Sequence, residues 1–128
     1  MDVNEKNIEA LIFELNGAAM RVLNELGHGL REKTYERALG VEFDYLQISC
    51  SQQKRYPVFY RGIKVDEYIP DMEVEAILLL DTKVVPKIGD NEIGQMINFL
   101  KITEKPVGLI HNFKHPTLEW RVVHAPKH

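Results

Sequence analysis

The hydrophobic period of the chain changes near residue 47, and this change restricts the possible folds more than any other feature. Between residues 8 and 46 apolar side chains recur at steps of three and four, which is typical of helices with one buried face. From residue 48 to residue 85 the period is two, which is typical of strands, and another helical pattern follows residue 90. Because 128 residues suit one hydrophobic core, the pattern predicts one α+β layered domain over residues 1–128.

The expected elements follow the order α-α-β-β-β-β-α-β-β. Helices are predicted at residues 8–26, at 31–46 and from about 90 onwards, and strands at residues 48–54, 56–62, 63–75, 77–85, 106–113 and 118–123. The residues expected to bound the helices are Asp2 or Asn4 at the start of the first, Gly27 and Gly29 at its end, and Asp90 or Asn91 at the start of the third.

Composition excludes some classes of protein. The formal net charge of −3 and the pI near 5.9 argue against a protein that coats nucleic acid by bulk charge, although carboxylates gathered around a metal ion would still allow a nuclease. The longest apolar run is too short to cross a bilayer, and the polar, acidic N-terminus does not predict a signal peptide. A single cysteine, Cys50, suits a reducing compartment, so we expect a cytoplasmic protein without a membrane partner.

The segment YIPDMEVEAILLLDTKVV, residues 68–85, predicts a hairpin that carries charges on its core strands. A turn centred on Ala76 would place Asp71 opposite Asp81, with Cβ atoms roughly 4.5–5.5 Å apart. Two like charges at that spacing need a shared proton, a cationic side chain or a metal ion between them. Lys83 projects from the same strand face as Asp81. The alternative is that Asp71 lies in water near a strand end while Asp81 and Lys83 form an ion pair.

Two further polar residues, Glu32 and Gln95, each have a functional and a structural interpretation. Glu32 precedes Tyr35 by three positions and Leu39 by seven, so it is expected on the buried stripe of the second helix, where a carboxylate needs a partner; the alternative is a first-turn residue favoured by the helix dipole. Gln95 flanks the apolar stripe of the third helix, or is a surface glutamine. Glu73 and Glu75 are expected towards the solvated turn, outside any site.

Surface roles are expected for two further groups. The five histidines show no helical pair and no cysteine partner, so surface or loop positions are expected for His28, His111, His115, His124 and His128. The basic residues around the second turn could meet a nucleic-acid backbone, but a solvated hairpin is the favoured interpretation for Lys54, Arg55, Arg61 and Lys64.

Four ordered segments resemble a known family. GLREKTY (residues 29–35) is similar to the Gly-x-x-Glu-x-x-Tyr signature of the GxxExxY proteins, a branch of the PD-(D/E)xK nuclease superfamily. IPDMEVEAILLLDTKVV resembles the Pro-Asp and (Asp/Glu)-x-Lys core, NEIGQMINFLKIT the glutamine helix, and VGLIHNF the strand after it. The resemblance covers residues 8–123 and implies a restriction-endonuclease-like core, a mixed central sheet flanked by helices. One departure is Asp81, where the family usually has glutamate.

The resemblance also implies a chemistry. Asp71 and Asp81 would bind Mg²⁺ or Mn²⁺ together with the carbonyl of Thr82 and waters, and Glu32 would complete the acidic shell. Lys83 would orient or activate the attacking water and stabilise the developing charge, and Gln95 would position Lys83, the water or the nucleic acid. Tyr35 would either hydrogen-bond within the site or pack between helix and sheet, and packing is the favoured interpretation.

The predicted function is therefore a metal-dependent nuclease acting on nucleic acid, DNA in preference to RNA. A nuclease-like module that only binds protein or nucleic acid is the alternative, and a hydrolase of small phosphate compounds is a third reading. A homodimer is expected, because one cleft cuts one strand and two sites would serve a duplex.

Overall fold

The computed structural model describes residues 5–127, and the expected caps Asp2 and Asn4 lie outside this range. Its elements are α1 (Glu5–Leu26), α2 (Glu32–Tyr45), β1 (Cys50–Ser51), β2 (Tyr56–Tyr60), β3 (Ile63–Tyr68), β4 (Met72–Val74), β5 (Leu78–Lys83), α3 (Asp90–Thr103), β6 (Val107–Asn112) and β7 (Glu119–His124). The predicted succession of two helices, a run of strands, a third helix and two further strands is confirmed, but the run between α2 and α3 has five strands where four were predicted.

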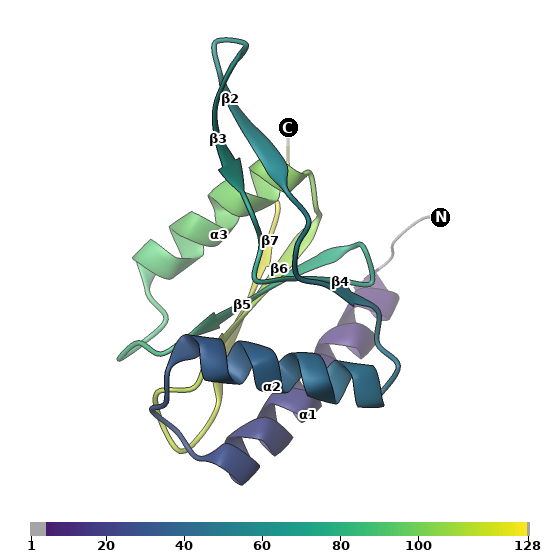
Figure 1. The fold of residues 1–128 in the computed structure, drawn as a ribbon, viewed down its shortest axis with the longest axis vertical. Coiled ribbons are helices and arrows are strands. Elements are labelled where there is room, and N and C mark those ends of the chain that lie inside the picture. Colours follow the sequence, from purple (N-terminus) through teal and green to yellow (C-terminus); the bar gives the residue numbers. More distant parts are fainter. Residues whose placement is uncertain (1–4, 128) are drawn as a thin grey trace.

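A five-stranded mixed sheet forms the centre of the fold (Figure 1). Its strand order is β1-β4-β5-β6-β7, with β5 and β6 parallel and the other neighbours antiparallel. Strands β2 and β3 form a separate two-stranded sheet that projects from the rest of the molecule in Figure 1. The α+β class is therefore confirmed.

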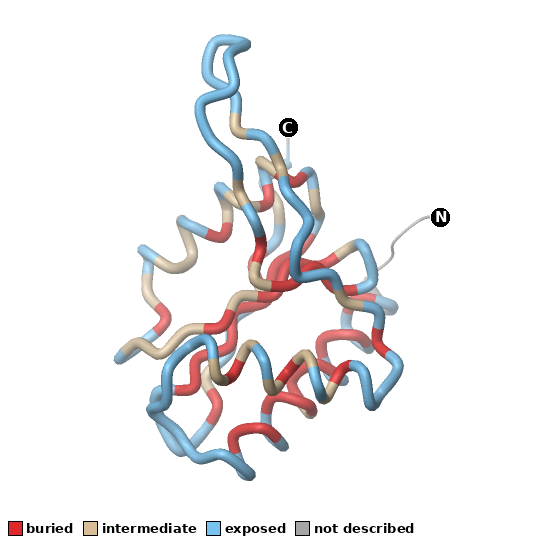
Figure 2. The backbone as a smooth tube through the Cα atoms, in the orientation of Figure 1, coloured by how far each residue is buried: buried red, intermediate tan, exposed pale blue. Residues whose placement is uncertain are grey.

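Helices cover both faces of the sheet, and the side chains of β5 alternate between them. Leu78 and Leu80 belong to a core cluster with the apolar stripes of α1 and α2. Leu79 belongs to a second cluster with Met96 and Leu100 of α3. Figure 2 shows the buried backbone concentrated in the sheet and in the helix faces turned towards it. The period of two along β5 therefore decides which of its polar residues face α3.

The predicted strand at residues 63–75 is wrong as a single element. Its first part is β3, in the hairpin, and its last part is β4, in the central sheet. The break falls at Ile69, Pro70 and Asp71, because a buried proline has no amide to donate to a ladder. The predicted strand at 48–54 is likewise reduced to Cys50–Ser51, the two residues that pair with β4.

The ends of the helices are partly as predicted. Gly27 and Gly29 adopt φ of +83° and +81°, so the expected break after α1 is confirmed. The expected cap of α3 at Asp90 or Asn91 is wrong, because Gly89 is the N-cap and its amide donates to Oε1 of Glu92 at 2.7 Å. Within residues 5–127, no helix combines the length and apolarity needed to span a membrane.

Candidate active site

The β4–β5 hairpin has the predicted register. Met72 pairs with Leu80 and Val74 with Leu78, around a turn in which Glu75 and Ala76 both have positive φ. Asp71 lies one residue before the start of β4, so continuing this register places it opposite Asp81. The pair therefore lies at the end of β5 where the strand leaves the core.

The carboxylate of Asp71 contacts both the backbone and the side chain of Thr82 on β5. Its Oδ2 accepts hydrogen bonds from the amide of Thr82 at 3.3 Å and from the Thr82 hydroxyl at 3.4 Å. Its carboxyl also lies within hydrogen-bonding reach of Asp81. Desolvation first, and then this hydrogen bond and the charge of Asp71, raise the pKa of Asp81 to about 8, against the opposing effect of Lys83. Near neutral pH the carboxyl pair therefore favours holding one proton, because two adjacent carboxylate charges repel each other.

Lys83 connects the carboxylates to α3. Its Nζ lies 3.2 Å from Oδ2 of Asp81 and donates to Oε1 of Gln95 at 2.9 Å. Asp81 and Lys83 are two residues apart on β5, so both face α3, where Gln95 lies. The structure thus brings four of the predicted site residues into one chain of contacts: Asp71, Asp81, Lys83 and Gln95.

Glu32 is placed differently from the expectation. It is the exposed first residue of α2, so the prediction that it lies on the buried stripe is wrong and its placement is that of a first-turn carboxylate. Its Oε2 accepts from the amide of Val84 at 3.3 Å, just beyond the Asp81–Lys83 segment. Among the described residues, no three His, Cys, Asp or Glu side chains gather closely enough to hold a metal ion. Glu32 is thus beside the carboxylate pair without joining it.

Glu36 is a carboxylate near the site that no sequence motif predicted. It lies one turn after Glu32 and is half-buried. Burial and the charge of Asp71 raise its pKa, while a hydrogen bond from Lys33 opposes the shift. The spacing of four residues from Glu32 was a signal that both could face the same strand end.

Tyr68 is a second neighbour of the site that the sequence argument did not identify. It ends β3 and stacks on Phe99 of α3 with ring centroids 4.0 Å apart. Burial, followed by the charges of Asp81 and Asp71, raises its pKa, so its hydroxyl stays protonated. No motif marked this residue, because its proximity depends on the chain break after β3.

The expectation for Glu73 is wrong, and that for Glu75 is right. Glu75 is exposed in the turn, whereas Glu73 is buried in β4. Burial alone would raise the pKa of Glu73, but a hydrogen bond from Tyr56 and the ammonium groups of Lys105 and Lys54 lower it overall. Three partners from other segments therefore make the buried carboxylate tolerable.

Tyr35 packs as expected and also holds a loop. It is fully buried, stacks on Phe113 at 4.2 Å between centroids, and donates its hydroxyl to the carbonyl of Gly27 at 2.6 Å. The same hydroxyl accepts from the amide of Leu30 at 2.9 Å. These contacts fix the loop before α2, and with it the position of Glu32.

Among the described histidines, His111 departs from the expected surface placement, and His128 lies outside the described residues. His111 is fully buried on β6, where its Nε2 lies 2.8 Å from Oδ1 of Asn16 on α1. Burial lowers its pKa to about 3, so the ring is neutral. Its contact with a distant helix could not be read from local sequence.

The donor atoms present at the end of β5 suit a hard divalent cation. The carbonyl of Lys83 accepts from the Phe113 amide on the β6 side. Because backbone groups of successive strand residues point to alternate sides, the carbonyl of Thr82 points to the other side, where the Thr82 amide meets Asp71. Two carboxylates and a carbonyl are oxygen ligands, and Mg²⁺ commonly binds one or two carboxylates and keeps its waters. The donor set therefore fits such an ion without Glu32.

Paired aspartates and a lysine towards the end of a central strand, with a glutamine from the helix that packs against them, in a mixed sheet flanked by helices, define a nuclease-like domain. Residues 9–123 match the PD-(D/E)XK nuclease superfamily, and the chain belongs to this superfamily. Its members generally use divalent metal ions. No curated protein and no solved structure matches the chain.

Proposed function

We propose that the protein is a metal-dependent nuclease of the GxxExxY group that hydrolyses phosphodiester bonds in nucleic acid, DNA in preference to RNA. The observation that supports this most directly is the chain of contacts from Asp71 through Asp81 and Lys83 to Gln95. The motif GLREKTY supports the GxxExxY assignment, and the DNA preference follows from the same resemblance. One domain spanning residues 1–128 and a cytoplasmic location belong to the same proposal.

The residues have distinct roles in this mechanism. Asp71, Asp81 and the carbonyl of Thr82 would hold Mg²⁺ or Mn²⁺, and Glu32 would bind one of the waters around the ion. When bound, the ion polarises the scissile phosphate and lowers the pKa of a water. Lys83 orients the attacking water and offsets the negative charge that develops on the phosphate. Gln95 is a positioning residue, since its amide oxygen holds the ammonium of Lys83.

The test is a cleavage assay on labelled single- and double-stranded DNA and RNA with Mg²⁺ or Mn²⁺. Lys83→Met keeps the length of the side chain and removes its charge, so we expect a loss of activity of about 100-fold or more. Lys105→Met is the matched control, because Lys105 is also partly buried and paired with a carboxylate. Cleavage that persists in Lys83→Met at the wild-type rate would exclude this site.

A binding module without catalysis is the second candidate, and the exposure of Glu32 favours it. A nuclease that needs a third direct carboxylate ligand would lack one here, since Glu32 stays at the Val84 amide. Nucleic-acid binding that is unchanged by divalent ions and accompanied by no cleavage would support the module.

We also propose that the protein acts on duplexes as a homodimer with two sites. The basis is geometric, because one carboxylate pair can serve one strand at a time. Sedimentation at micromolar concentration that shows only a monomer, with and without duplex, would contradict it.

A further inference from the structure

We propose that the β2–β3 hairpin is a docking arm that inserts into a groove of double-stranded nucleic acid next to the Asp71–Asp81 pair. The inference rests on the proposed function and names the part of the molecule that holds its substrate. It depends on four features of the hairpin: where it is attached, what it exposes, how its charge differs from that of the chain, and the shape of its tip.

The hairpin is attached at the site itself. Strand β3 ends at Tyr68, which stacks on Phe99, and only Ile69 and Pro70 separate it from Asp71. Strands β2 and β3 pair with each other and with no strand of the central sheet. A strand of six residues spans about 20 Å. A nucleic acid bound along the length of the hairpin would therefore extend towards the carboxylate pair.

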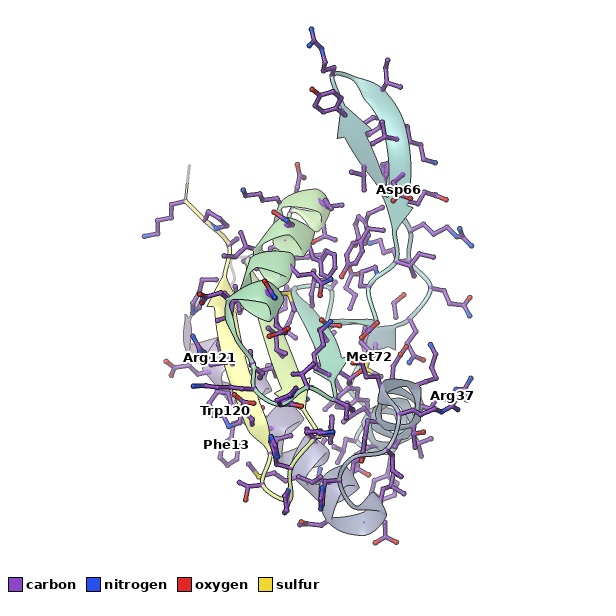
Figure 3. All side chains as sticks on the ribbon, turned by 90° about the vertical axis from the view of Figure 1, so that its left-hand side faces the viewer. Phe13, Arg37, Asp66, Met72, Trp120 and Arg121 are labelled. Carbon is purple, nitrogen blue, oxygen red and sulfur yellow. The ribbon has the colours of Figure 1, made fainter. Side chains whose placement is uncertain are left out.

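The outer half of the hairpin exposes large apolar side chains. Phe59, Tyr60 and Ile63 are 62%, 67% and 68% exposed, and Val65 is exposed beside them. Figure 2 shows the outer part of the hairpin exposed along both strands, and in Figure 3, where Asp66 marks it, the hairpin extends beyond the helices with side chains on both sides of its ribbon. Apolar side chains grouped on a projecting element, where they stabilise no core, indicate a contact surface.

The charge of the hairpin is opposite to that of the chain. Residues 54–67 carry four basic and two acidic residues, whereas the whole chain has a net charge of −3. Arg55 and Lys64 pair with Glu67 at 3.3 and 3.4 Å. Within residues 5–127 the structure records no ion pair for Arg61, which lies in the turn at the tip. Cations bind phosphates and aromatic rings stack on bases, so a surface with both suits a nucleic acid better than an apolar protein surface.

The shape of the tip favours a groove of a duplex. Arg61 and Gly62 have φ of +50° and +78°, so the turn has two residues and the ribbon stays narrow to its end. A two-stranded ribbon fits the major groove of a duplex. Arg61 would enter first, Lys64 would meet phosphates, and Phe59 and Tyr60 would contact sugars or bases.

The test measures duplex affinity by fluorescence anisotropy in EDTA, where no cleavage can occur, over a range of salt concentrations. We expect the double variant Arg61→Ala, Lys64→Ala to bind about tenfold more weakly at low salt and to lose one to two units of the salt slope. Phe59→Ala with Tyr60→Ala should weaken binding with little change in slope. Arg61→Lys retains the charge and the turn and should bind within about twofold of wild type. Arg21→Ala removes an exposed charge from α1, and wild-type affinity is expected.

Steady-state cleavage then separates the two proposals. Hairpin variants that raise KM and leave kcat unchanged support the arm, because they remove binding away from the reacting groups. If the wild type cleaves and every hairpin variant keeps the wild-type KM and affinity, the docking-arm proposal is wrong. The nuclease proposal is unaffected by that result. Equal binding of single strands and duplexes by wild type, or hairpin variants that alter only self-association, also overturns the docking-arm proposal. A wild type that neither binds nor cleaves nucleic acid overturns both.

Discussion

Asp71 and Asp81 illustrate, at the scale of single residues, how a site can lower the stability of the fold that carries it. The two carboxyls lie together at the end of a buried strand, and Lys83 is the one cation in contact with Asp81 in the described part of the chain. Replacing one charge should therefore relieve repulsion when no metal is bound.

Asp81→Asn is expected to raise the free energy of unfolding of the metal-free protein by about 1 kcal/mol at about pH 9, where both carboxyls would otherwise carry charge. Urea unfolding in EDTA measures this, and the same variant should lose cleavage activity. Asp66→Asn, on the exposed hairpin, is the control and should change stability little. A lower stability for Asp81→Asn would show that the ion pair with Lys83 outweighs the repulsion.

His111 gives a dependence of stability on pH with a definite sign. Its folded pKa of about 3 is below the unfolded value near 6.5, so the unfolded chain binds the proton first. Its contribution to stability is complete above about pH 6.5 and falls by about 1.4 kcal/mol per pH unit as the pH drops towards 3. His111→Gln keeps an amide next to Asn16 and should remove this slope between about pH 6 and 4. Parallel curves for the two proteins in urea titrations would contradict the assignment.

Residue positions were predictable where strand period and turn placement determine them. The turn at Ala76 and the period of two placed Asp71, Asp81 and Lys83 together, as the register confirms. The burial of Glu73 was not predictable, because its partners Lys54, Tyr56 and Lys105 come from segments far apart in sequence. Glu32 was misplaced because a helical stripe does not reveal whether its first turn extends beyond the sheet.

Gly108 determines how closely α3 approaches the sheet, at the scale of elements. It lies in the buried strand β6, and a Cβ atom at this position would overlap Sδ of Met96 on α3 and lie 2.7 Å from its Cγ. Any side chain at this position would therefore displace the methionine or the helix. Since α3 carries Gln95, the glycine also affects how Gln95 meets Lys83.

Gly108→Ala is expected to lower the free energy of unfolding by about 1–3 kcal/mol through overpacking. Met96→Ala opens space at the same point, so the double variant should lose less than the two single variants added together. Denaturant curves for the four proteins give the coupling directly. Strictly additive losses would mean that the alanine is accommodated elsewhere.

Elements were predictable by type and less so by pairing. Periodicity identified the three helices and the main strands. It could not show that residues 63–75 divide between two sheets. The alternation of side chains is uniform along this segment, and only the proline at position 70 interrupts the strand. Nor could periodicity show that β5 and β6 are parallel while β4 and β5 are antiparallel, which depends on α3 crossing over the sheet between them.

Metal binding should increase the thermal stability of the whole molecule. An ion that binds the folded state alone raises the melting temperature, on the order of 5 °C at a concentration about tenfold above Kd. We expect this rise with Mg²⁺ or Mn²⁺ in differential scanning calorimetry. Asp71→Asn should abolish it, because it removes one of the two carboxylate charges.

A monovalent salt at equal ionic strength controls for screening of the net charge of −3. Equal shifts in wild type and Asp71→Asn would mean that the ion binds elsewhere. No shift in wild type would favour the binding module over the enzyme.

The short link between Tyr68 and Asp71 has a thermodynamic consequence. Pro70 is buried and its ring fixes one of the few torsions in the link, so the link between the hairpin and the carboxylate has little conformational freedom. If, as proposed, the hairpin binds the polymer and the carboxylates bind the ion, the two binding events are coupled, and the coupling works equally in both directions. The factor by which the divalent ion raises the affinity for the polymer must equal the factor by which the polymer raises the affinity for the ion.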